Sequence, residues 1–71
     1  MKMNRQTIVR FPAGSWSGGG NPEDPDYAMC EVYVIQAPSF EKAKKRAQSV
    51  RAQLRKKGAA LPTQASPYTE A

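Results

Sequence analysis

Apolar residues recur at steps of three and four along residues 39–58, which read SFEKAKKRAQSVRAQLRKKG. Because an α-helix turns by about 100° per residue, it places these apolar residues within an arc of roughly 80°. The pattern predicts one amphipathic helix over residues 39–57 with a narrow apolar stripe toward the core. The apolar stripe consists of Phe40, Ala43, Ala47, Val50 and Leu54.

Residues suited to helix ends flank this segment. Ser39 is a good N-cap, and Glu41 places a negative charge in the first turn, where it suits the helix dipole. Gly58 can adopt the left-handed conformation that follows a helix C-terminus. The boundaries of the helix are therefore predicted together with its apolar face.

Two shorter segments, residues 5–11 and 28–36, have the composition and alternation of β-strands. Pro12 ends the first, because proline cannot continue a ladder of hydrogen bonds. The sequence thus predicts an α+β fold, a small ββα unit in which one C-terminal amphipathic helix packs on one face of a two-stranded antiparallel hairpin. Residues 1–58 would form this single domain. The tail, residues 59–71, lacks periodicity and is predicted to be disordered.

Both faces of the predicted hairpin are apolar, so one of them needs a second cover. We expect the helix to pack on the face that carries Val9, Phe11, Cys30, Val32 and Val34. The opposite face would then carry Ile8, Met29, Tyr33 and Ile35. An exposed apolar patch of this kind is typical of an interface. Ile8, Tyr33 and Ile35 are therefore candidates for contact with a second copy or a partner protein, unless Trp16, Leu61 or Tyr68 covers them.

The connection over residues 12–27, PAGSWSGGGNPEDPDY, is longer than ordinary hairpin loops, which favours function or disorder. Trp16 in its middle has two interpretations: it stacks on a base or anchors in a partner, or it folds back onto the small core. The acidic residues Glu23, Asp24 and Asp26 match no calcium loop, and no GK[ST] follows the three glycines.

Positive charge is concentrated on the predicted helix. The chain has a net charge of +5, and residues 39–58 hold eight bases and one acid, a net charge of +7. Lys44, Arg51 and Arg55 fall within about 40° on one flank of the helical wheel, and the other bases cover the opposite side. Such asymmetry points to an anionic partner or to a solubilising surface. The candidate contact residues are Lys44, Lys45, Arg46, Arg51, Arg55, Lys56 and Lys57.

Several function classes are disfavoured. The chain has no histidine and one cysteine, Cys30, which we interpret as a small buried apolar residue. Without paired carboxylates or a nucleotide fingerprint, we expect no enzyme activity, no metal and no cofactor. No apolar run is long enough to span a membrane and no signal peptide is evident, so a cytoplasmic protein without membrane contact is expected.

Two binding functions remain. In the first, the basic helix contacts the backbone of nucleic acid or a nucleic-acid-associated complex. In the second, the chain is an accessory protein of the phage or mobile-element type that regulates or inhibits a host protein through its apolar sheet face and long loop. This comparison rests only on the short length and single-domain character of the chain, because no motif supports a specific family. An acidic protein surface would suit the basic helix as well.

Overall fold

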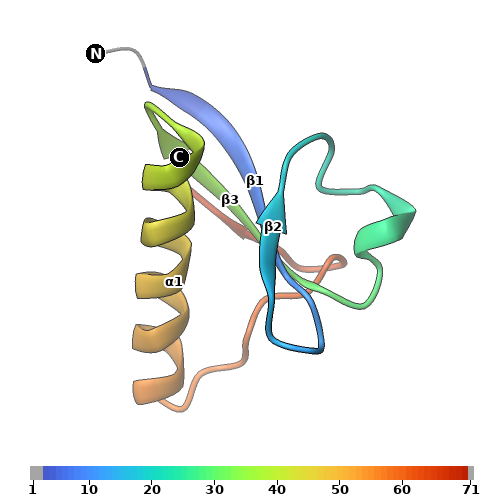
Figure 1. Cartoon of the computed structure of the whole chain (residues 1–71). Helices are drawn as coiled ribbons and strands as arrows, with labels where there is room; N and C mark the ends of the chain where they lie inside the picture. Colours follow the sequence, from blue (N-terminus) through green and yellow to red (C-terminus); the bar gives the residue numbers. More distant parts are fainter. Residues whose placement is uncertain (1–2, 71) are drawn as a thin grey trace.

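The computed structural model describes residues 3–70 as one helix packed on a four-stranded mixed sheet (Figure 1). The class is therefore α+β, as predicted, but the sheet is larger than the expected hairpin. Its strand order is β2-β1-β3-β4. The elements in chain order are β1 (Asn4–Arg10), β2 (Trp16–Gly18), the 3-10 helix η1 (Pro25–Tyr27), β3 (Glu31–Ala37), α1 (Phe40–Lys56) and β4 (Tyr68–Thr69).

The two central strands, β1 and β3, pair antiparallel over their whole length, from Asn4 opposite Ala37 to Arg10 opposite Glu31. Ile8 lies opposite Tyr33, and Val9 lies opposite Val32. Because side chains alternate along a strand, the first pair points to one face of the sheet and the second pair to the other. This register creates the two apolar faces that the sequence predicted.

The helix covers the face opposite to the one expected. Ile8, Tyr33 and Ile35 are fully buried and form the main core with Ala43 and other residues of the apolar stripe. The prediction that the helix packs on the face of Val9 and Val32 is wrong, because alternation shows which side chains share a face but not which face the helix selects. Two of the five stripe residues are alanines, and bulky sheet side chains fill the space that alanines leave.

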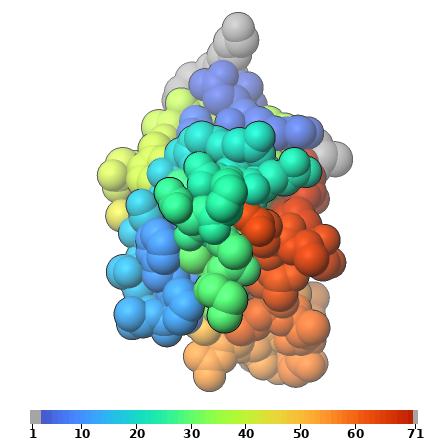
Figure 2. Space-filling view, turned by 90° about the vertical axis from the view of Figure 1, so that its right-hand side faces the viewer, coloured from blue at the N-terminus to red at the C-terminus, as the bar shows by residue number. Residues whose placement is uncertain are grey.

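An irregular layer buries the second face of the sheet. Val9, Cys30 and Val32 form a second buried cluster under Phe11 and Tyr27. The loop of residues 19–30 and the tail lie next to each other over this face (Figure 2). Gln64 joins them, since its Nε2 donates to the carbonyl oxygens of Asp24 at 2.6 Å and Pro22 at 3.2 Å. The sheet is thus enclosed between the helix and this layer.

The long connection contains β2, a strand that the sequence analysis missed. A tight turn closed by Phe11 N–H donating to Ser15 C=O at 2.9 Å leads from β1 into β2. Gly18 is required at its end because a Cβ there would lie 2.1 Å from the Thr7 carbonyl oxygen and 3.0 Å from the Phe40 ring. The strand has only three residues and one of them is glycine, which is depleted in strands, so composition gave little signal for this edge strand.

The helix ends as the sequence predicts, but the tail differs. Ser39 Oγ accepts from the Lys42 amide at 3.3 Å, and Gly58 has a φ of 69°. The tail then crosses back to place β4 parallel to β3, with Tyr68 opposite Tyr33. Residues 59–70 therefore return to the sheet and end beside β3, a course that the expectation of a disordered tail did not include. No helix within residues 3–70 combines the length and apolar character needed to cross a membrane.

Candidate nucleic-acid interface

The residues predicted to form an exposed apolar interface belong to the core instead. Ile8, Tyr33 and Ile35 each have 0% of their surface exposed, because α1 covers them. Trp16 is half-buried, and its ring lies 5.7 Å from the Tyr33 ring, at the edge of the same cluster. The expected exposed face of Ile8, Tyr33 and Ile35 does not exist in this structure, and Trp16 alone keeps accessible surface.

Glu31 holds one of the predicted contact residues, Arg51, inside the fold. Its Oε1 accepts from Arg51 Nε at 2.8 Å and from the Tyr33 hydroxyl at 2.7 Å, while its Oε2 lies 3.4 Å from Arg10 Nη1. Burial, together with this hydrogen bond to Glu31, raises the pKa of Tyr33 well above its ordinary value. Arg51 therefore joins the helix to both central strands, and its side chain is only 17% exposed.

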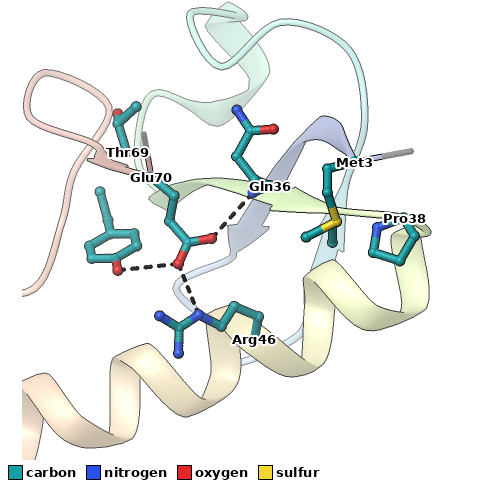
Figure 3. A pocket seen from close by; sticks show the side chains of 8 residues that line it. Met3, Gln36, Pro38, Arg46, Thr69 and Glu70 are labelled. Atoms are coloured by element: carbon teal, nitrogen blue, oxygen red, sulfur yellow. Dashed lines mark hydrogen bonds and ion pairs between the residues drawn. The ribbon is translucent and has the colours of Figure 1, made fainter. Parts of the chain in front are cut away.

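Arg46 on the other flank holds the C-terminal segment. Its Nε donates to Glu70 Oε2 at 2.9 Å, and Glu70 Oε1 accepts from the Gln36 amide at 3.2 Å (Figure 3). The hydrogen bond and charge of Glu70 raise the pKa of Arg46. The Glu70 carboxylate thus accepts the hydrogen bond that a neighbouring strand would otherwise accept from the edge of β3. Arg46 holds this carboxylate in place, so its side chain stabilises the fold.

These groups lie in an open pocket of about 680 Å³ between the start of α1 and β4. Figure 3 shows the Glu70 carboxylate pointing into it between Arg46 and the backbone of Gln36. The Tyr68 hydroxyl also donates to Glu70 Oε2, at 3.5 Å. The pocket's carboxylate is thus engaged by the protein itself. The lining residues are Met3, Gln36, Ala37, Pro38, Arg46, Tyr68, Thr69 and Glu70.

The other helix bases face solvent. No carboxylate of residues 3–70 lies within 4.0 Å of their nitrogens, and all are exposed except Lys44, which is half-buried. Lys42, Lys45 and Lys56 lie on the part of α1 that points away from the sheet. Lys44 and Arg55 lie on the flank beside Arg51, and Lys57 is the C-cap residue at the end of the helix. We call this set the basic helix surface. It consists of Lys42, Lys44, Lys45, Arg55, Lys56 and Lys57.

The acidic residues of the long loop lie on the opposite side of the molecule. Glu23, Asp24 and Asp26 belong to the layer that covers the far face of the sheet from α1 (Figure 1). Asp24 Oδ1 accepts from the Asp26 amide at 2.9 Å and caps η1. The molecule therefore presents positive charge on one side and negative charge on the other. Such a separation orients an approaching polyanion toward the helix.

The side chains that most often bind metals in proteins are dispersed over residues 3–70. No three residues among histidine, cysteine, aspartate and glutamate are close enough there to hold a metal ion. Cys30 is 5% exposed, and burial raises the pKa of its thiol, which keeps it in the less reactive protonated form.

Sequence reasoning missed which bases are free and which are engaged. The signal was present in part, since Glu31 and Glu70 are isolated acids in otherwise apolar or neutral segments. Their partners lie 20 and 24 residues away along the chain, so only the fold reveals the pairs Arg51–Glu31 and Arg46–Glu70.

No known protein family, curated protein or solved structure matches this chain.

Proposed function

We propose that this chain is a small non-catalytic binding protein whose basic helix surface contacts the phosphate backbone of nucleic acid. The observation that carries the proposal is that no base of the basic helix surface has a carboxylate partner within 4.0 Å among residues 3–70. Lysine and arginine neutralise phosphates and release condensed counterions, which makes binding favourable and dependent on salt.

The composition of this surface argues against a purely solubilising role. Solubilising surfaces usually intersperse both signs of charge, and acids placed four residues from bases support an exposed helix. Here Glu41 is the one acid in the whole of α1. The like charges of Lys45, Lys56 and their neighbours repel one another in the free protein, and an anionic ligand would relieve this repulsion.

Backbone contact suits the geometry better than base readout. The 17 residues of α1 extend over about 25 Å, which is long enough to follow several phosphates. Its exposed bases are distributed over most of the circumference of the helix, whereas base-specific recognition uses a few side chains on one narrow face. We therefore expect weak dependence on nucleic-acid sequence.

The second candidate function loses its main support. An accessory protein that binds a host protein through an apolar sheet face needs that face to be exposed, and Ile8, Tyr33 and Ile35 are buried. An acidic protein surface remains chemically suited to the basic helix surface, and the experiment below separates the two ligands.

Fluorescence anisotropy with labelled oligonucleotides at 50 and 250 mM salt tests the proposal. If about four phosphate contacts form, the affinity falls a few hundredfold between these concentrations. Replacing Lys45, Arg55 and Lys56 together by glutamine should lower both the affinity and the salt dependence, and glutamine keeps the helix intact. Arg5→Gln, an exposed base on β1 away from the helix, is the control and should change little. Absence of binding at low salt would refute nucleic acid as the ligand and favour an acidic protein.

A further inference from the structure

The flank of α1 that faces β2 combines basic and aromatic side chains. Lys44, Arg51 and Arg55 lie on this flank, and the pairing of Arg51 with Glu31, which also meets Arg10 of β1, fixes its position beside the β1–β2 hairpin. Arg51 is occupied by this pairing. Lys44 and Arg55 have no carboxylate partner among residues 3–70 and can bind an anionic ligand.

Two aromatic rings lie along the same edge. The Phe40 ring covers Gly18, since its Cε2 lies 3.0 Å from the position of a Cβ on that glycine, and Phe40 remains 37% exposed. Trp16 precedes Gly18 by two residues, so its side chain points to the same face of β2 as that position. Its ring is backed by the Tyr33 ring at 5.7 Å and keeps part of its surface accessible. Both rings are therefore fixed at the border of the helix flank.

We propose that this flank binds single-stranded nucleic acid, with bases stacked on Trp16 and Phe40 and phosphates held by Lys44 and Arg55. We call these four residues the aromatic–basic strip. Bases within a duplex are stacked on each other and cannot reach the rings, whereas unpaired bases can. The inference rests on the proposed function and adds to it a preference for single strands.

The charges beside the rings favour this ligand over an apolar peptide. An apolar partner would have to remove Lys44 and Arg55 from water without a counter-charge, which is costly. Glu31, the acid of this part of the sheet, already serves Arg10, Tyr33 and Arg51. A single strand supplies both the phosphates and the flat apolar bases that the strip can receive.

Trp16 is the only tryptophan of the chain, so its fluorescence reports directly on the strip. The test titrates the protein at low salt with four probes of equal length: single-stranded DNA, single-stranded RNA, duplex DNA and an abasic deoxyribose-phosphate strand. The two base-containing single strands should quench Trp16 fluorescence and bind at least about tenfold more tightly than the abasic strand. The DNA and RNA arms show whether the ribose hydroxyl matters.

Variants then separate stacking from charge. Phe40→Leu keeps an apolar side chain over Gly18 but removes the ring, and should weaken single-strand binding about fivefold or more without changing abasic binding. Lys45→Gln, away from the strip, should weaken both probes equally. Equal affinity for the abasic and base-containing strands, or no quenching of Trp16, would overturn the strip while leaving the proposed function standing. No binding of any probe would refute both, and this comparison of probes needs only the unmodified protein.

Discussion

Replacing Glu31 tests the network that orients the basic helix. Glu31→Ala removes the acceptor of Arg51 Nε, of the Tyr33 hydroxyl and of Arg10. The Arg51 side chain is 17% exposed and Tyr33 is fully buried, so both donors lose a partner in a place that water reaches poorly. Such orphaned donors cost about 2–4 kcal/mol in total. A domain of 71 residues is expected to have only about 4–10 kcal/mol of stability, so the loss is large.

Urea unfolding followed by circular dichroism measures this loss. Glu31→Gln keeps an acceptor oxygen and the side-chain shape, so it should cost less, about 1–2 kcal/mol. Glu41→Gln removes an exposed acid from the first turn of α1 and serves as the control, with an expected change of less than about 1 kcal/mol. If Glu31→Ala unfolded within about 0.5 kcal/mol of the parent protein, the network would carry no stability and the reasoning would fail.

Three further predictions concern other parts of the fold. Gly18→Ala should cost about 3 kcal/mol or more, because the new methyl group overlaps the Thr7 carbonyl; a melting temperature equal to the parent's would contradict the position of β2. Folding raises the pKa of Tyr33, so its neutral hydroxyl contributes to the free energy of unfolding. This contribution is complete below the unfolded pKa of about 10 and is lost as pH rises above it. Tyr33→Phe should reduce this alkaline loss of stability, measured by urea unfolding at several pH values. Glu70→Ala should increase hydrogen exchange at the Gln36 amide, and unchanged protection there would argue against its bond to Glu70.

Sequence alone predicted the helix and the two central strands well, because each has a strong local signal. The spacing of the apolar stripe and the caps Ser39 and Gly58 define α1 without reference to the rest of the chain. The two edge strands were not predicted. β2 has three residues and β4 has two, and strands this short exist only through their pairing with neighbours.

The choice of sheet face needed information that alternation does not contain. Val32 and Tyr33 are neighbours on the strongly apolar strand β3 and point to opposite faces of the sheet, so either face could have met the helix. Non-local contacts decide the outcome: Arg51 reaches Glu31 on the face of Tyr33, and Gln64 secures the loop over the face of Val32. Ion pairs also separate the candidate contact residues into two groups. Arg46 and Arg51 are paired with Glu70 and Glu31, whereas the basic helix surface has no carboxylate partner among residues 3–70.

Mapping of backbone amide shifts by NMR tests the central claim most directly. The labelled protein is titrated at low salt with a short single-stranded oligonucleotide. If the basic helix surface binds phosphate, the shifted amides lie along α1, near Lys44, Lys45, Arg55 and Lys56, and recover when salt is raised. Shifts confined to the acidic loop around Glu23 and Asp26, or no shifts in α1 at low salt, would contradict the account.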